Sequence, residues 1–159
     1  MSPATGRYTG TADWDTIGKV RQNLNVPLIA NGDIVSGAKA VECLRRTGAD
    51  YLMAGRAAFG DPWLFREINE ALEGRPITPR PPLAQRMETV CRQIRIARED
   101  KGEHIACLEA RKHINWYLRG VAYANYYKDQ VSHISSMEEA DRRRNLFFCG
   151  DIDKRAIDK

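Results

Sequence analysis

Two short turns in the first half of the chain combine glycine with groups that could bind an anion. Asn31-Gly32-Asp33 and Gly55-Arg56 each follow a short apolar run and precede a helical stretch. A glycine lets the backbone approach a ligand closely, and the free N–H groups of such a turn can point at an anion. The Arg56 guanidinium would add a planar pair of donors that matches phosphate oxygens. These residues therefore indicate phosphate binding.

The same turns also have an interpretation without a ligand. Short glycine turns are common where a strand leads into a helix, and Asp33 could simply act as a local cap. Against this, two consecutive strand–glycine–helix units at the end of an α/β region fit the phosphate site that the last two loops of a parallel α/β barrel often build. The spacing alone leaves both interpretations open.

The charge of the chain is a further feature that bears on its partners. The chain carries 25 Lys and Arg against 21 Asp and Glu, a net charge of +4. The surplus lies mainly in the second half. A solvated helix surface and a contact with a polyanion explain so modest a surplus equally well.

Metal chemistry and disulfides are not expected. The four cysteines, at positions 43, 91, 107 and 149, form no C-x-x-C pair, and no histidine stands where a zinc site would need one. We expect ordinary buried or half-buried thiols in a reducing compartment.

The composition is that of an ordinary globular chain. It has 159 residues, of which 43% are hydrophobic and 29% charged, with a mean hydropathy of −0.52. No apolar run approaches the ~20 residues of a membrane span, and the first residues lack the apolar core of a secretory signal. We therefore expect a cytoplasmic protein without a membrane partner.

Two strands must position the glycine turns. Apolar runs at residues 26–30 and 50–54 predict neighbouring parallel strands that end at the two turns. Helical patterns alternate with them at about 12–23, at 37–47 after an N-cap at Ser36, and from an Asp61-Pro62 cap to Gly74. This alternation is typical of an α/β fold. Since two strands cannot close a barrel, we expect residues 1–75 to be the C-terminal portion of a larger unit that begins before Met1.

The second half is predicted to be all-α. Four prolines within residues 75–82 predict an extended linker at 76–82, because proline removes a backbone donor and fixes φ. Residues 83–148 should form an antiparallel bundle of three or four helices, and residues 149–159 a loose tail. The helices are expected at about 83–101, 104–119 and 123–133, and from a capping box at Ser136 onward.

Four segments in order resemble the C-terminal part of the tRNA-dihydrouridine synthases. They are residues 8–15, 26–34, 55–65 and 110–118. The resemblance runs from about residue 7 to about residue 145. It implies the end of a TIM barrel that binds FMN, followed by a helical domain that binds tRNA. It also implies an enzyme that uses NADPH-reduced FMN to reduce the C5–C6 double bond of uridines in tRNA.

The resemblance assigns roles to the two glycine turns and to a third segment. Asn31, Gly32, Asp33, Gly55 and Arg56 match the family's FMN-phosphate segment. The basic run Arg111, Lys112 and His113 matches a stretch of the helical domain that contacts tRNA in relatives. Nearby aromatic residues could stack on bases, although core packing explains them better: Trp116, Tyr117, Tyr123, Tyr126 and Tyr127.

The family's catalytic cysteine, and its flavin-contacting lysine and histidine, belong to earlier strands that have no counterpart here. We assign no cysteine or histidine of this chain to catalysis and expect the chain alone to be inactive. An incomplete barrel would also be prone to self-association. Two alternatives remain: a non-catalytic tRNA-binding helical module, and another phosphate-binding flavin barrel that acts on a small molecule.

Overall fold

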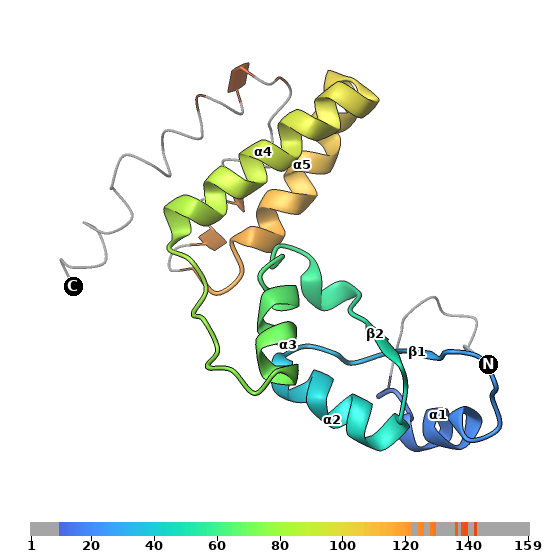
Figure 1. Cartoon of the computed structure of the whole chain (residues 1–159). Coiled ribbons are helices and arrows are strands. Elements are labelled where there is room, and N and C mark those ends of the chain that lie inside the picture. The colour runs from blue at the N-terminus through green and yellow to red at the C-terminus, as the bar shows by residue number, and fades with distance from the viewer. Residues whose placement is uncertain are drawn as a thin grey trace. The chain divides into compact units, whose positions relative to one another are not determined.

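A computed structural model of the chain describes residues 10–121 together with 124, 125, 128, 129, 136, 138, 139 and 142. These residues fall into two compact units, one of residues 10–58 with 62–78 and one of residues 59–61 with those from 79 onward. Figure 1 shows the elements of both units. Their order is α1 (Trp14–Arg21), β1 (Ile29–Asn31), α2 (Gly37–Thr47), β2 (Tyr51–Met53), the 3-10 turn η1 (Arg56–Ala58), α3 (Leu64–Leu72), α4 (Leu83–Lys101) and α5 (Glu103–Tyr117).

The two strands of the first unit pair in parallel, as predicted. Ile29 lies opposite Tyr51 and Asn31 opposite Met53. Both strands are shorter than the apolar runs, and β1 begins at residue 29 rather than 26. Before β1, Pro27 has no N–H to contribute to a strand ladder, and the Leu28 N–H donates to Asp50 Oδ2 at 2.8 Å.

Only one face of this sheet is covered within the described residues. Ala30 is buried against the helices, while Ile29, Tyr51 and Met53 are exposed by 54%, 62% and 52% on the alternate positions. Parallel sheets are normally covered on both faces. The uncovered apolar face is therefore consistent with a partial α/β fold.

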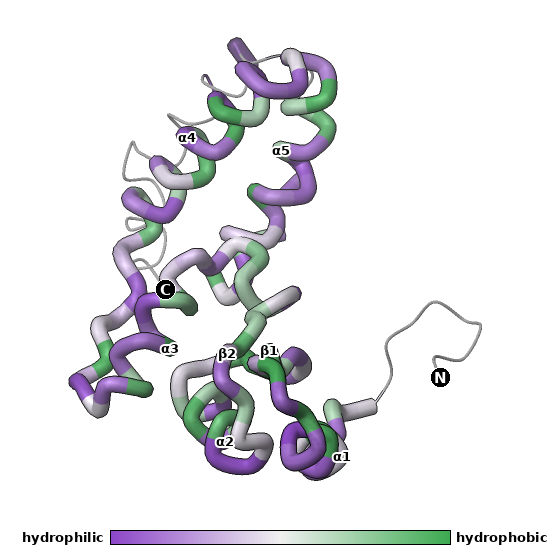
Figure 2. The backbone as a smooth tube through the Cα atoms, turned by 45° about the vertical axis from the view of Figure 1, so that its right-hand side comes forward, coloured by the Kyte–Doolittle hydropathy of each residue, from purple (hydrophilic) through white to green (hydrophobic). Residues whose placement is uncertain are grey.

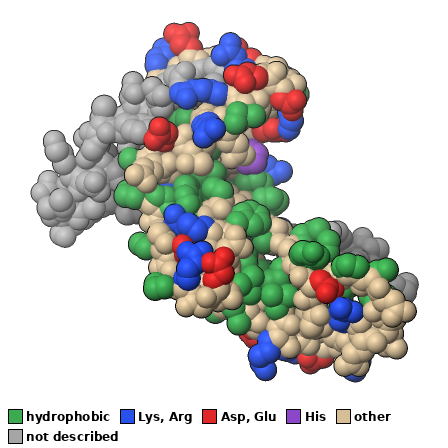
Figure 3. Space-filling model, viewed as in Figure 1, with side chains coloured by type: hydrophobic (Ala, Val, Ile, Leu, Met, Phe, Trp, Pro, Cys, Tyr) green, Lys and Arg blue, Asp and Glu red, His purple; other side chains and the backbone are tan. Residues whose placement is uncertain are grey.

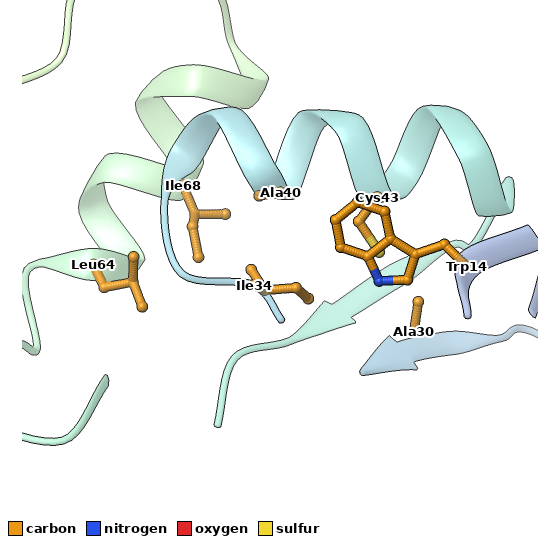
Figure 4. Close-up of a cluster of buried hydrophobic side chains, with 7 residues drawn as sticks. All are labelled: Trp14, Ala30, Ile34, Ala40, Cys43, Leu64 and Ile68. Atoms are coloured by element: carbon orange, nitrogen blue, oxygen red, sulfur yellow. The ribbon is translucent and has the colours of Figure 1, made fainter. Parts of the chain in front are cut away.

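Helices α1, α2 and α3 pack on the covered side of the sheet and enclose the core of the first unit. Figure 4 shows its seven buried residues: Trp14, Ala30, Ile34, Ala40, Cys43, Leu64 and Ile68. Helix α2 has the predicted bounds, because local signals define both of its ends. The Lys39 N–H donates to the Ser36 side chain at the start, and Gly48 adopts a left-handed φ of 62° at the end.

The predicted cap of the third helix was wrong. Helix α3 begins at Leu64 after Trp63, whose side chain makes no capping hydrogen bond. The Asp61 carboxylate instead accepts from the Arg80 guanidinium, at 2.7 Å from Nη2. The Asp61 carboxylate, which the sequence pattern assigned to the start of α3, therefore forms a long-range ion pair.

The second unit contains the antiparallel pair α4 and α5, joined at Gly102. Arg86, near the start of α4, donates to the carbonyl of Tyr117 at the end of α5. At the other end of the pair, Lys101 Nζ lies 2.9 Å from Glu109 Oε1. Figure 2 shows hydrophilic and hydrophobic positions alternating along both helices, the pattern of amphipathic helices that pack on one side.

A bundle of three or four helices is not confirmed, since α4 and α5 are the long helices that the described part of this unit contains. Most of the helix expected at 123–133, most of the one from Ser136 and the tail at 149–159 lie outside the described residues. At Ser136 itself, the Glu139 N–H donates to the serine hydroxyl at 3.2 Å, as expected for a helix start. Residues 75–82 carry neither helix nor strand, and their role as a domain linker stays a prediction.

Candidate functional site

The first glycine turn lies at the carboxyl end of β1. The Asn31 side chain donates to the carbonyl of Met53 at 3.1 Å and so ties the ends of the two strands together. Gly32 has φ 120° and Asp33 has φ 55°. Glycine is strongly preferred at a φ of 120°, and a non-glycine residue with a φ of 55° is uncommon.

Residues 12 and 14 hold this turn from behind. The Ala12 N–H donates to Asp33 Oδ2 at 2.6 Å, and the Trp14 indole N–H donates to the Gly32 carbonyl at 3.1 Å. A Cβ on Gly32 would lie 2.5 Å from the Ala12 Cβ, so glycine is required there. The ligand-free interpretation expected Asp33 to act as a local cap. In the structure its Oδ2 accepts from the Ala12 N–H instead. Sequence reasoning missed the role of Trp14, since no local pattern marks a bond between residues 18 positions apart.

The second glycine turn follows β2 by one residue. Gly55 is exposed, and a Cβ added there would meet nothing within 4 Å. The Ala58 N–H donates to the Gly55 carbonyl at 3.0 Å and starts η1 with Arg56, which is also exposed. Gly55 stands two residues beyond Met53, the partner of Asn31. With strands ~4.8 Å apart and a rise of ~3.3 Å per residue, the two turns lie within roughly 12 Å of each other.

The residues at this edge of the sheet fit an anion. Backbone N–H groups of two glycine turns and one guanidinium form the donor set, and the space around Gly55 is open to a ligand. The Asp33 carboxylate would oppose an anion, but one of its oxygens already accepts a backbone hydrogen bond. Phosphate binding at the carboxyl end of the strands stays a prediction.

The basic run on α5 is arranged around Trp116. Lys112 is exposed, with its ammonium 5.4 Å from the centroid of the Trp116 ring. The same ring stacks on Phe59, with centroids 4.4 Å apart, and meets His113 edge-on at 5.2 Å. These protein contacts occupy the indole, and Tyr117 is only 3% exposed. Both aromatics therefore act in packing rather than as free stacking surfaces, while Tyr123, Tyr126 and Tyr127 lie outside the described residues.

His113 differs from Lys112 in its environment. Its ring is half-buried, and this burial lowers the pKa of His113 below the usual value of 6.5. The Gln93 amide nitrogen lies 3.1 Å from His113 Nδ1. With the Gln93 amide in this orientation its nitrogen donates, and a neutral His113 ring can accept at Nδ1. His113 is therefore uncharged near pH 7, and Arg111 is half-buried beside it.

Residues 59–61 pack against α5 within the second unit. A Cβ on Gly60, which has φ 75°, would lie 2.3 Å from the carbonyl carbon of Trp116. Burial, reinforced by the charge of Asp61, raises the pKa of the Tyr117 hydroxyl. The Tyr117 hydroxyl donates to Gln93 Oε1 at 3.4 Å, so Gln93 links it to His113.

Two of the three described cysteines are buried thiols, and Cys91 is half-buried. Cys43 and Cys107 are buried, and burial raises the pKa of both thiols. Across the part of the chain that the structure describes, no three His, Cys, Asp or Glu side chains gather in a way that could hold a metal ion. None of the described helices combines the length and apolarity that crossing a bilayer requires.

Comparison with known proteins points to one family. The family model for dihydrouridine synthases matches residues 2–152. The chain is 39% identical to the tRNA-dihydrouridine synthases B of Salmonella typhimurium and Escherichia coli (strain K12), over 141 residues that make up 89% of this chain and 44% of each relative. It is 38% identical to a probable tRNA-dihydrouridine synthase of Rickettsia conorii, over 79% of this chain and 38% of that protein. The chain thus spans about two fifths of the length of these relatives.

Proposed function

The chain belongs to the dihydrouridine synthase family, and from this premise we propose that it supplies the FMN-phosphate site and a tRNA contact of an enzyme that converts uridine to dihydrouridine in tRNA. The relatives named above are tRNA-dihydrouridine synthases, or a probable one. We place the protein in the cytoplasm, where tRNA is modified.

The observation that carries this proposal is the meeting of two glycine turns at the carboxyl edge of a parallel sheet. Phosphate sites of α/β barrels are built at that edge, by loops that follow neighbouring strands. Asn31, Gly32, Gly55 and Arg56 would hold the phosphate of FMN through backbone N–H groups and a guanidinium, and Asp33 would shape the turn.

Bound FMN, reduced by NADPH, would supply the hydride that saturates the C5–C6 bond of uridine. This chain's own residues would bind and orient the phosphate end of the cofactor. No cysteine of this chain is assigned as the proton donor. We therefore propose that the 159-residue chain alone forms no dihydrouridine.

On the second unit, Lys112 is the proposed phosphate contact for tRNA. Its ammonium is exposed and packs over an indole ring, which limits the positions that the side chain can take. Arg111, half-buried, would add a second charge. His113 would take part through packing, because its ring is neutral near pH 7.

The experiment that tests the enzymatic proposal is a chimera. The part of the Escherichia coli relative that this chain does not match is fused to it and assayed for NADPH-dependent dihydrouridine in unmodified tRNA. We expect product formation, and a large loss with Arg56→Ala that excess FMN partly restores. A folded chimera that binds FMN and tRNA but forms no product would overturn the proposal.

A non-catalytic tRNA-binding module is the second candidate. The exposure of Lys112 favours it independently of the flavin site. Binding of tRNA by the chain alone, with no response to FMN, would support this alternative. A flavin barrel that acts on a small molecule has less support, because a small substrate would not need the basic helical unit.

A further inference from the structure

We propose that Trp14 and Asp33 are positioning residues that hold the turn at Asn31, Gly32 and Asp33 in the conformation that binds the cofactor phosphate. The inference rests on the proposed function, since it concerns the same anion site. It assigns a role to Trp14, and it changes the role of Asp33 from a ligand contact to a brace of the turn.

The turn is held at two consecutive residues by one segment of the chain. The Gly32 carbonyl accepts from the Trp14 indole at 3.1 Å, and Asp33 Oδ2 accepts from the Ala12 N–H at 2.6 Å. Both acceptors belong to residues with positive φ. Such a conformation is costly for Asp33, and the two hydrogen bonds offset that cost. Without them the turn could relax to another backbone conformation.

Trp14 is itself immobile, which a brace requires. Its side chain is 4% exposed and packs in the core with Ala40 and Cys43 (Figure 4). Two cations of α2 lie over its ring, Lys39 Nζ at 5.5 Å and Arg46 Cζ at 5.4 Å. Core packing and cation–π contacts therefore fix the direction of the indole N–H.

The charge of Asp33 supports a positioning role rather than a ligand contact. A carboxylate and a phosphate repel each other, so Asp33 gains nothing from facing the cofactor phosphate directly. Its hydrogen bond to Ala12 directs one oxygen toward the protein backbone. An uncharged acceptor of the same shape should therefore serve at least as well.

The first arm of the test changes Trp14 in the full chain. FMN is titrated into ¹⁵N-labelled protein while the amide signals of Gly32 and Gly55 are followed, with riboflavin as the probe that lacks phosphate. Trp14→Phe keeps an aromatic ring but removes the indole donor. We expect it to weaken FMN binding about fivefold, the equivalent of one ordinary hydrogen bond. Trp63→Phe makes the same chemical change at the start of α3 and should bind FMN like the native chain.

The second arm separates the hydrogen bond of Asp33 from its charge. Asp33→Asn keeps an acceptor and tolerates a positive φ, so FMN should bind as tightly as to the native chain or more tightly. Asp33→Gly adopts the same φ without an acceptor and should bind about fivefold more weakly. If Asp33 had a purely structural role, asparagine would not restore FMN binding. The loss of affinity would also not be confined to FMN, the probe that carries a phosphate.

The outcomes are distinguishable. If the native chain shows no response to FMN at Gly32 or Gly55, the proposed cofactor site fails, and this inference fails with it. If the native chain binds FMN and folded Trp14→Phe binds it equally well, only the positioning role is overturned. Equal losses in Asp33→Asn and Asp33→Gly would likewise contradict it, because they would show that binding depends on the negative charge of Asp33 and not on its hydrogen-bond acceptor.

Discussion

In the sequence, several polar side chains look equally able to bind a ligand. The structure separates them, because some of their polar atoms already contact other groups of the protein. Asp33 accepts the Ala12 N–H, and His113 Nδ1 lies 3.1 Å from the Gln93 amide nitrogen. Lys112, in contrast, presents an exposed ammonium against the Trp116 ring. At the scale of single residues, the tRNA contact is therefore expected to depend on Lys112 more than on His113.

Removing the charge of Lys112 tests this ranking. Each lysine that contacts a phosphate contributes about one to the slope of log affinity against log salt concentration. Lys112→Ala should therefore weaken tRNA binding and lower that slope by about one, as measured by filter binding at several salt concentrations. Lys101→Ala is the matched control, because the Lys101 ammonium is paired with Glu109 at 2.9 Å. An unchanged slope in Lys112→Ala would remove this residue from the interface.

His113 makes stability depend on pH in a defined direction. Because burial holds the pKa of His113 below 6.5 in the folded protein, the unfolded chain binds more protons just below that pH. The stabilisation is thus complete above about pH 6.5 and is lost as the pH falls through the folded-state pKa. Urea unfolding between pH 7.5 and 5.5 should show a smaller fall in the free energy of unfolding for His113→Gln than for the native chain. Parallel curves would contradict the assignment.

At the scale of elements, the segment at 59–61 shows how a short connection fixes a helix. Phe59 stacks on Trp116, Asp61 pairs with Arg80, and the backbone at Gly60 presses against α5. Together these contacts hold the end of α5 that carries Trp116. The geometry of the basic run therefore depends on a segment about fifty residues earlier in the chain.

Two glycine-to-alanine substitutions separate the energetic cost of a positive φ from the cost of a steric clash. Gly60→Ala would place a Cβ 2.3 Å from the Trp116 carbonyl carbon, at φ 75°. We expect it to lower the free energy of unfolding by about 3 kcal/mol or more. Gly120 also has a positive φ, but a Cβ added there would meet nothing within 4 Å. Gly120→Ala should cost only about 1–2 kcal/mol. Equal losses in urea unfolding would show that the contact with α5 does not matter.

At the scale of the whole molecule, the uncovered sheet face is the main feature. Among the described residues, Ile29, Tyr51 and Met53 are exposed on this face. A cavity of about 290 Å³ lies between β2 and α3, lined by the polar Asp50 and Asn69 as well as by apolar residues such as Leu52 and Phe65. Figure 3 shows hydrophobic side chains exposed on the first unit, which contains the sheet. Burying such surface is favourable by about 25 cal/mol per Å², so an uncovered face favours association.

We therefore predict that the chain self-associates. Sedimentation velocity should show a mass that rises with protein concentration, and Met53→Glu should shift the distribution toward the monomer. Val20→Glu, at a site of similar exposure on α1, is the control and should leave the distribution unchanged. A monomer at every concentration would show that the sheet face does not drive assembly.

The sequence by itself determined the features that depend on neighbouring residues. Glycine, serine and proline act through local backbone geometry, so the bounds of α2 and the two glycine turns could be predicted. The alternation of apolar runs with helices predicted the parallel pairing of β1 and β2. The resemblance likewise identified the family, which the comparisons confirm. The residues of the phosphate and tRNA contacts stay predictions.

Only the tertiary structure decided which polar groups of these turns and helices form hydrogen bonds within the protein and which could bind a ligand. Asp61 pairs with Arg80 instead of capping α3, Asp33 bonds to Ala12, and Trp14 supports Gly32. Each of these bonds joins residues 18–21 positions apart. No periodicity or cap pattern encodes such a bond, because its energy depends on how separate elements pack, and packing brings the partners together only in the folded chain.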